Sequence, residues 1–287
     1  MMKIPSLTLR GKPVVKMPAL GYGTWKLKGD ACVASVRKAL ELGYRHIDTA
    51  QIYGNGAEVG TAVRDSGVKR KDIFLTTKVW TTQFQPADLR ASVEESLEKL
   101  QTDYVDLLLL HWPNPHVDLT KTIKALSSVR GIGKARAIGV SNFTTDLMQE
   151  VRHVLSSLQG GAYLACNQVE YHLLLNQAPV LDYARKHEIA VTAYSPLAEG
   201  RLRDHPLCTE IGQAHGKSAA QVALRWLIDQ GVAAIPKAAS EANMRANIDI
   251  FDFEFTDAER IALTALNERS HQRQIDPDFA PIWDKPD

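Results

Sequence analysis

Short apolar runs alternate with amphipathic stretches along most of this chain, and the alternation predicts how it folds. Eight runs are short and mostly apolar on both faces, which is typical of strands in a covered parallel sheet. These runs are residues 19–21, 46–48, 73–78, 105–111, 137–140, 165–169, 190–194 and 233–236. We therefore expect a parallel sheet with helices on its outside.

The stretches between the runs carry apolar residues at helical spacing and have recognisable ends. In the first, Asp30 is expected to cap a helix that ends at Gly43. Pro86 is expected to open another helix, and a third should begin after Ser218 and stop at Gly231. Eight strands with intervening helices predict a (β/α)8 TIM barrel.

Two segments fall outside this repeat. Residues 6–19 look like a β-hairpin that turns near Gly11, and it is expected to plug the closed end of the barrel. A capped helix is expected after residue 255, followed by a Pro- and Asp-rich tail, residues 271–287, that should drape over the barrel mouth. No linker interrupts the alternation, so residues 1–287 are expected to form a single domain.

Composition narrows the possible functions. The formal net charge is +1 and there is no long basic run, which argues against nucleic-acid or membrane-surface binding. The three cysteines, Cys32, Cys166 and Cys208, are widely spaced, as expected for a reducing cytosol and not for a zinc site or disulfide scaffold. No signal peptide or membrane span is recognisable, so a cytoplasmic protein is expected.

Four polar residues lie at or just beyond the ends of the apolar runs. They are Asp48, Tyr53, Lys78 and His111. The carboxyl ends of barrel strands converge on one mouth, so these side chains should meet there. An acid, a phenol, an amine and an imidazole together are suited to proton transfer to a carbonyl oxygen.

The reference pKa values suggest a role for each residue. A phenol is a weak acid near neutral pH, and a nearby ammonium lowers its pKa. Tyr53 is therefore the expected general acid, Lys78 its tuning partner and Asp48 the partner of Lys78. His111 is expected to hydrogen-bond the substrate carbonyl. None of these residues can donate a hydride, so a cofactor must supply it.

Each residue alone also has a purely structural explanation. An Asp at a strand end is often a cap, a Tyr or His is often packed and hydrogen-bonded, and a Lys is usually solvated. The joint placement of the four on successive strand–helix units favours the catalytic interpretation. Lys78 is the most informative, because a lysine that ends a buried apolar run needs a partner.

Three longer segments resemble the signatures of the aldo-keto reductase family. Residues 43–60, 133–143 and 235–247 resemble the first, second and third signatures, and the similarity covers nearly the whole chain. The resemblance implies a (β/α)8 barrel and NADPH-dependent reduction of aldehydes or ketones to alcohols. It also implies that the family's Asp, Tyr, Lys and His tetrad falls on Asp48, Tyr53, Lys78 and His111.

The resemblance further implies a cofactor site. Ser141, Asn142 and Gln168 match residues that hydrogen-bond the nicotinamide carboxamide, and Tyr194 matches the ring on which the nicotinamide stacks. The full expected set is Gly23, Thr24, Trp25, Asp48, Ser141, Asn142, Gln168, Tyr194, Ser195, Pro196, Leu197, Ile235, Lys237, Ala238, Asn243 and Asn247. Structural roles remain open for the individual residues, such as capping of a helix by residues 140–143.

This chain departs from the family pattern near the adenosine phosphate. Ala238 stands where a Ser or Thr is common, and Asn243 replaces an Arg that pairs with the 2′-phosphate. Lys237 is retained, and Arg245 could substitute for the missing Arg. NADPH is still the expected cofactor, with NADH use possible. Gly56 replaces a common Glu, with little effect expected on the chemistry.

Aromatic residues are expected to form the substrate pocket. The expected lining is Trp25, Trp80, His111, Trp112 and Trp283, with Phe84, Asn114 and Phe279 as weaker candidates. The segments that follow His111 and Tyr194 are short, as in bacterial reductases of 2,5-diketo-gluconic acid and small dicarbonyls. A wide mouth and broad specificity are therefore expected, with a small-molecule carbonyl as substrate and a monomer as the assembly.

Two other classes of function compete with this interpretation. Some proteins of this family are cofactor-sensing subunits with little turnover, and this remains the alternative to a reductase. A metal-dependent barrel hydrolase would need clustered His and carboxylate ligands at strand ends, and no such cluster is apparent. No metal site is expected.

Overall fold

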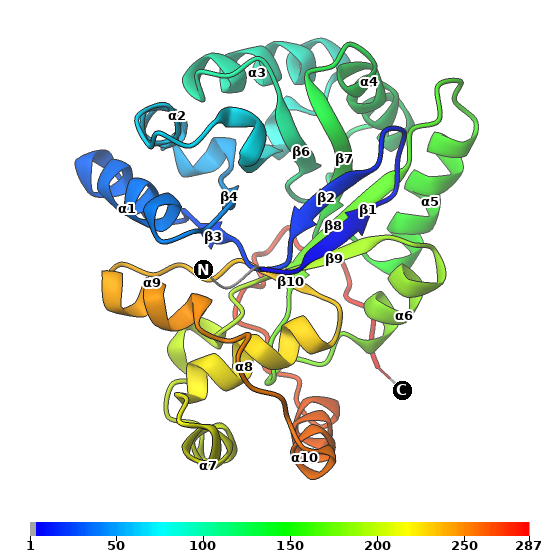
Figure 1. Cartoon of the computed structure of the whole chain (residues 1–287). Helices are drawn as coiled ribbons and strands as arrows, with labels where there is room; N and C mark the ends of the chain where they lie inside the picture. The colour runs from blue at the N-terminus through cyan, green and yellow to red at the C-terminus, as the bar shows by residue number, and fades with distance from the viewer. Residues whose placement is uncertain (1–3, 287) are drawn as a thin grey trace.

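Eight parallel strands form the centre of the molecule, and helices surround them (Figure 1). This computed structural model describes residues 4–286. The strands, in chain order and sheet order, are β3 (Tyr22–Gly23), β4 (His46–Asp48), β5 (Phe74–Val79), β6 (Val105–Leu110), β7 (Ala135–Ser141), β8 (Leu164–Glu170), β9 (Ala190–Tyr194) and β10 (Ala233–Ala234). Each pairs with its chain neighbour, which is the order that a βα repeat produces.

The sheet closes on itself between its first and last strands. Gly21 N donates to Ala234 O and Ala234 N donates to Ala19 O, both at 2.8 Å. Leu20 and Ala234 form a parallel bridge. The first predicted strand, residues 19–21, is therefore the segment that closes the ring, while β3 itself lies just beyond it. The barrel expected from the sequence is confirmed.

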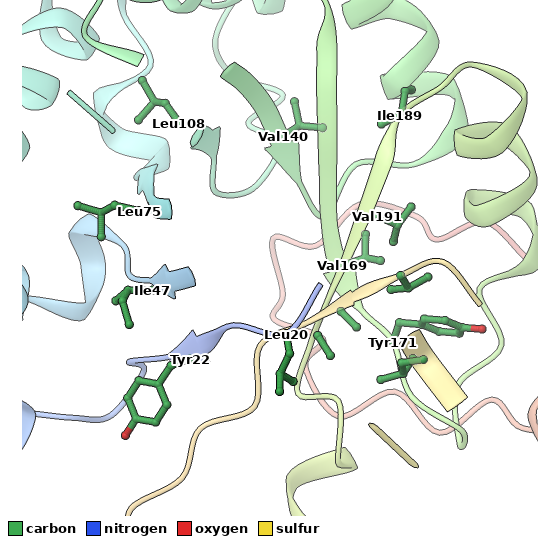
Figure 2. Close-up of a cluster of buried hydrophobic side chains, with 14 of the residues drawn as sticks. Leu20, Tyr22, Ile47, Leu75, Leu108, Val140, Val169, Tyr171, Ile189 and Val191 are labelled. Atoms are coloured by element: carbon green, nitrogen blue, oxygen red, sulfur yellow. The ribbon is translucent and has the colours of Figure 1, made fainter. Parts of the chain in front are cut away.

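Alternate residues of the strands face two different apolar layers, which explains why the strands are mostly apolar on both faces. Outward residues such as Ile47, Leu75 and Leu108 belong to one large cluster that includes residues of the surrounding helices. Figure 2 shows labelled members of this cluster on successive strands. Inward residues such as Phe74 and Leu109 belong to a second, smaller cluster inside the barrel.

Gly139 shows how tightly β7 approaches β8. A Cβ atom at this position would lie 2.4 Å from the carbonyl oxygen of Cys166. No side chain can be accommodated at that distance, so β7 requires glycine here.

Residues 4–286 contain ten α-helices. They are α1 (Gly29–Glu41), α2 (Gly56–Arg64), α3 (Pro86–Lys99), α4 (Leu119–Gly131), α5 (Thr145–Ser156), α6 (Ala178–Lys186), α7 (Pro206–His215), α8 (Ala219–Asp229), α9 (Glu241–Ile248) and α10 (Asp257–Glu268). Short 3₁₀ turns η1 (Gln51–Tyr53), η2 (Arg70–Asp72), η3 (Thr81–Gln83) and η4 (Ala198–Gly200) lie in the connections.

The predicted helix ends are confirmed in most cases. Pro86 opens α3, and Ser218 caps α8 in a capping box with Gln221. Gly231, with φ of 73°, follows α8 directly after its C-cap residue. The prediction for Asp30 was wrong: α1 begins at Gly29 after Lys28, and Asp30 lies in its first turn, where a carboxylate favours the helix dipole.

The N-terminal hairpin closes one end of the barrel. Strands β1 (Ser6–Leu9) and β2 (Val15–Pro18) pair antiparallel, so the predicted hairpin is confirmed. Leu9, Val15 and Met17 pack in the same cluster as Phe74 and the other inward residues of the barrel. The hairpin therefore fills the end at which the strands begin.

The chain after α10 is irregular. In Figure 1 this red segment runs behind the barrel, at the end opposite the blue hairpin. No helix among residues 4–286 has the length and apolar character needed to cross a bilayer.

Candidate active site

The four polar residues singled out in the sequence meet at the end of the barrel where the strands finish. Asp48 is the last residue of β4, Lys78 is the fifth of six residues in β5, and His111 follows β6 directly. Tyr53 ends the 3₁₀ turn η1, five residues after Asp48. The barrel thus brings residues from three successive strand–turn units to one place.

Lys78 is the centre of this group. Its side chain is fully buried, and the ammonium donates to Asp48 Oδ1, to Thr49 O at 3.0 Å and to Tyr53 Oη at 3.3 Å. An ammonium has three protons, so all three donors have acceptors. This arrangement fixes the rotamer of Lys78 and holds it against the Tyr53 phenol.

The charge on Lys78 is stabilised by its neighbours. Burial acts to lower the pKa of the Lys78 ammonium, but Asp48 and Tyr53 outweigh it and the pKa is raised. The other oxygen of Asp48, Oδ2, accepts from Gln168 Nε2 at 2.7 Å. A buried ion pair is tolerated only when its remaining polar atoms are also bonded, and this pair meets that condition.

The environment of Tyr53 keeps its phenol protonated. Burial raises the pKa of Tyr53, the Lys78 ammonium acts against that rise, and the Asp48 carboxylate adds to it. The effect of Lys78 therefore has the expected direction, but burial outweighs it. At neutral pH the phenol keeps its proton while hydrogen-bonded to a cation.

His111 is neutral in this environment. Burial and the nearby Lys78 charge lower the pKa of its imidazole well below the ordinary value. Its ring makes edge contacts with Tyr53 and Trp80, with centroids 5.7 and 5.2 Å apart. Nδ1 is buried and has no hydrogen-bond partner among the described residues. A neutral imidazole can donate one hydrogen bond, here beside the Tyr53 ring.

Asp48, Tyr53 and His111 line a cavity of about 500 Å³, whereas Lys78 is buried behind them and is not part of the lining. That volume is in the usual range for small-molecule sites. The predicted residues that line it are Gly23, Thr24, Trp25, Asp48, Tyr53, Trp80, His111, Trp112, Asn142, Gln168, Tyr194, Ser195, Pro196, Ile235 and Lys237. The structure thus gathers most of the expected site around one space.

A polar network forms the side of the cavity nearest β7, β8 and β9. Asn142 Nδ2 donates to His111 O at 3.0 Å, and Asn142 Oδ1 accepts from Tyr194 Oη at 2.8 Å. Ser141 Oγ donates to Gln168 O at 2.7 Å. Asn142 has a φ of 64°, a left-handed conformation that is uncommon outside glycine and often occurs at functional sites.

A second cavity of about 280 Å³ adjoins the first. Trp25, Ser195, Pro196 and Lys237 line both, so the two spaces share a wall. The second also contains the predicted Leu197, together with the cations Lys26 and Arg203 and the acid Glu199. Three lysine or arginine side chains therefore surround this smaller space.

Some predicted residues do not line either cavity. Ser141 and Ala238 are buried behind the first one, and Ala238 O accepts from Tyr22 Oη at 2.6 Å. On α9, Asn247 is buried, whereas Asn243 is exposed. Arg245, the possible substitute for the missing arginine, is paired with Glu241 on the same helix, at 2.6 Å.

The aromatic candidates occupy different places. Trp283 lies outside the cavity lining but packs against Trp112, with ring centroids 5.9 Å apart. Phe279 contacts the rings of Trp80 and Trp112 at 6.1 and 5.5 Å. Phe84 is a core residue of the outer cluster. Asn114 donates to Thr81 O at 3.1 Å.

Several lining residues were not identified from the sequence. Gln274, Ile275, Asp276 and Pro277 of the C-terminal segment line the larger cavity, as does Ile52 beside Tyr53. The only available signal was the irregular, Pro- and Asp-rich composition of the tail. Such a composition indicates a loop but not which side chains face a cavity.

Within residues 4–286, the structure contains no group of three or more His, Cys, Asp or Glu side chains arranged to hold a metal ion.

The fold and this arrangement agree with the comparison to known families. Residues 19–268 match the aldo/keto reductase family, and the chain belongs to that family.

Two relatives named as reductases match most of the chain. Methylglyoxal reductase DkgB of Yersinia pestis is 40% identical over 273 residues, which is 94% of this chain and 100% of the relative. Glyoxal reductase of Bacillus subtilis (strain 168) is 41% identical over 256 residues, which is 88% of this chain and 90% of the relative.

Solved structures agree closely with this fold. A crystal structure provisionally assigned as a 2,5-diketo-D-gluconic acid reductase B superposes with a TM-score of 0.89 at 48% identity, covering 93% of this chain and 94% of the other. An aldo/keto reductase from Brucella melitensis gives a TM-score of 0.86 at 40% identity and covers 92% and 100%.

Proposed function

We propose that this protein catalyses the NADPH-dependent reduction of aldehydes and ketones to alcohols, with Tyr53 as the general acid. The observation that carries the proposal is the buried Lys78, which contacts both Asp48 and the Tyr53 hydroxyl beside His111. Membership of the aldo/keto reductase family and the names of two relatives, a methylglyoxal reductase and a glyoxal reductase, support carbonyl reduction.

The two adjoining cavities fit a dinucleotide. The larger one offers the Tyr194 ring, Asn142 and Gln168, which suit a planar carboxamide-bearing ring. The smaller one has three cations, Lys26, Arg203 and Lys237, which suit phosphate groups. When bound there, a reduced nicotinamide supplies the hydride.

NADPH is the proposed cofactor, and the preference over NADH rests mainly on Lys237 and Arg203. The family's phosphate-binding Arg is replaced by Asn243, which is exposed on α9, and Arg245 is already paired with Glu241. The retained cations still favour a 2′-phosphate. Use of NADH is therefore expected at a measurable rate.

The protein's own groups handle the proton. Tyr53 Oη donates a proton to the carbonyl oxygen as negative charge develops there, and the adjacent Lys78 ammonium stabilises the phenolate that remains. Asp48 keeps Lys78 charged and oriented. The neutral His111 donates a hydrogen bond to the same carbonyl oxygen and orients the substrate.

The C-terminal tail is proposed to cover the mouth and form the substrate wall. Residues 274–277 line the cavity, and Phe279 lies against the rings of Trp80 and Trp112. A cavity of about 500 Å³ with several aromatic walls favours a broad range of carbonyl compounds over one small substrate.

The test is a steady-state assay that follows the absorbance of reduced nicotinamide, with NADPH and NADH in parallel. The substrates would be methylglyoxal, nitrobenzaldehyde, a diketo-sugar acid and a bulky cyclic ketone. Turnover with several of them, faster with NADPH, is the expected result.

Tight binding of either cofactor without turnover of any carbonyl would contradict the proposal. It would favour the alternative, a cofactor-sensing subunit of the same fold. Turnover confined to one compound would contradict the broad specificity but not the reaction.

A further inference from the structure

A buried carboxylate at the end of β8 binds the backbone of the C-terminal tail. Glu170 is the last residue of β8 and its side chain is fully buried. Its Oε1 accepts from Gln274 N at 2.7 Å, and its Oε2 accepts from Ile275 N at 2.9 Å. The carboxylate is therefore bound to two consecutive peptide groups more than a hundred residues away in the chain.

His172 supplies a third donor to the same carboxylate. His172 Nε2 lies 2.9 Å from Glu170 Oε1, and both side chains are fully buried. A carboxylate only accepts hydrogen bonds, so Nε2 must carry the proton. Three donors around a buried carboxylate form strong, charge-assisted hydrogen bonds.

Residues 267–272, just before this contact, are hydrogen-bonded at several points to the loop that follows β8. Gln272 N donates to Leu174 O, and Asn176 N donates to Ser270 O, both at 2.8 Å. Asn267 Nδ2 donates to carbonyl oxygens in the same loop, including His172 O and Leu175 O at 3.1 Å. The two hydrogen bonds to Glu170 are thus the last of a series of hydrogen bonds that joins residues 267–275 to the end of β8 and the loop after it.

Beyond Ile275 the tail is fixed by contacts other than those with Glu170. Among the described residues, its hydrogen bonds to the barrel are those of Asp284, which accepts from Thr145 N at 3.0 Å and Thr145 Oγ1 at 2.7 Å. Between these two points the tail bonds to itself: Trp283 Nε1 donates to Asp276 Oδ1 at 2.8 Å. The Arg273 guanidinium lies 3.7 Å from the centre of the Trp283 ring.

The tail residues that Glu170 binds form part of the wall of the larger cavity. Gln274 and Ile275, whose amides it binds, both line the cavity, as do Asp276 and Pro277 directly after them. Glu170 itself is not part of the lining. It pairs in register with Tyr194 of β9, which does line the cavity.

We propose that Glu170 is a positioning residue for substrate binding: its carboxylate fixes the backbone of residues 274 and 275 and so sets the wall that bulky carbonyl compounds contact. This inference rests on the proposed reductase function. Small dicarbonyls can bind at Tyr53 and His111 without reaching this wall. Larger substrates need Ile275 and Pro277 in place.

The test compares the wild-type enzyme with Glu170→Gln. The carboxamide keeps the shape of the side chain but turns one acceptor into a donor that faces the tail amides. Hydrogen exchange at Gln274 and Ile275 should become faster. KM for a bulky aromatic ketone should rise about tenfold, the scale expected for lost hydrogen bonds to a charged group.

Other quantities should stay nearly constant in this variant. The kcat values, the KM for methylglyoxal, the NADPH affinity and the pH profile of kcat should remain within about twofold of wild type, because Tyr53, Lys78 and His111 are unaffected. Glu94→Gln is the matched control. Glu94 is exposed on α3 and pairs with Lys134, so the same chemical change there should alter none of these measurements.

Faster exchange together with a selective rise in KM for the bulky ketone supports the proposal. Unchanged exchange, or an equal rise in KM for small and bulky substrates, overturns it. If Glu170→Gln does not fold, Glu170→Asp keeps the charge but moves the carboxylate one methylene away from the tail amides, and it must then show the same selective effect. Absence of any carbonyl reduction by the wild-type enzyme would instead be a failure of the proposed function, while the exchange experiment would still report on the contact.

Discussion

Lys78 links Asp48 and Tyr53, which come from separate elements of the chain, in one hydrogen-bonded group. It is fully buried, and its three acceptors come from Asp48, Thr49 and Tyr53. Removal of any one of these groups leaves a buried charge less well satisfied. The strand ends therefore determine both the position and the charge state of the group.

Substitution Tyr53→Phe tests the acid directly. The ring is retained and only the hydroxyl is lost, so kcat for carbonyl reduction should fall by roughly 100-fold or more. NADPH affinity should change little. Steady-state kinetics and a cofactor-binding titration measure the two quantities.

Tyr183→Phe is the matched control for that experiment. Tyr183 lies on α6 and accepts a hydrogen bond from Arg152, away from the cavity. It should retain wild-type kcat. A wild-type rate in Tyr53→Phe would show that another group donates the proton.

The buried histidines predict how stability depends on pH. Burial lowers the pKa of His46 and, with Lys78, lowers the pKa of His111 well below its ordinary value. The unfolded chain then binds protons that the folded chain does not. Stability should be fully retained above about pH 6.5 and should fall below it, by up to about 1.4 kcal/mol per pH unit for each such histidine.

Urea unfolding at a series of pH values measures this dependence. His111→Asn should have a shallower loss of stability between about pH 6.5 and 5.5 than the wild type, because it lacks one of the two groups. His116→Asn changes an exposed histidine and should keep the wild-type slope. Equal slopes in all three proteins would mean that His111 is protonated in the folded state.

Helix α8 has a complete start signal, as α10 does. The Ser218 hydroxyl accepts from Gln221 N, and Gln221 Oε1 accepts from Ser218 N at 2.9 Å. The sequence predicted this helix correctly because its cap, apolar face and terminal glycine are all local. Asp30 was misassigned because acidic residues are also common in the first turn of a helix, and Asp30 lies there, two residues after the actual cap, Lys28.

Ser218→Ala should therefore destabilise the protein by about 1 kcal/mol. The melting temperature should drop by roughly 2–4 °C for a chain of this size. Differential scanning calorimetry provides the measurement, and kcat should be unchanged. Ser128→Ala on the exposed side of α4 should have no comparable effect.

The tail marks the limit of what local patterns reveal about the site. Asp48, Lys78 and His111 could be predicted as site residues because the apolar pattern of the sequence shows where each strand ends. Residues 274–277 could not, because their position depends on Glu170, which precedes Gln274 by 104 residues. Contacts of such long range leave no periodic signal in one sequence.

The whole molecule is organised around two ends of one barrel. The hairpin β1–β2 packs into the end where strands begin, and the catalytic candidates lie at the end where strands finish. Parallel strands make this separation possible, because all of them start at one end and finish at the other. We therefore expect that stability and chemistry can be altered independently.

Met17→Ala tests that independence. Met17 is fully buried in the inner cluster, and its truncation should cost about 2–5 kcal/mol of unfolding free energy. At a temperature where the variant remains folded, kcat and KM should match the wild type. Val14→Ala, at an exposed site between β1 and β2, should change the unfolding free energy far less. A loss of kcat in folded Met17→Ala would indicate that the two ends are coupled.

The distribution of tryptophans has a spectroscopic consequence. The chain has five, and Trp25, Trp80, Trp112 and Trp283 line the larger cavity or pack against its wall. Trp226 instead packs against Tyr171 in the outer cluster. Intrinsic fluorescence of the unlabelled protein should therefore report mainly on the mouth, over a constant background from Trp226. Titrations with cofactor or carbonyl compound can then measure occupancy at equilibrium, separately from turnover.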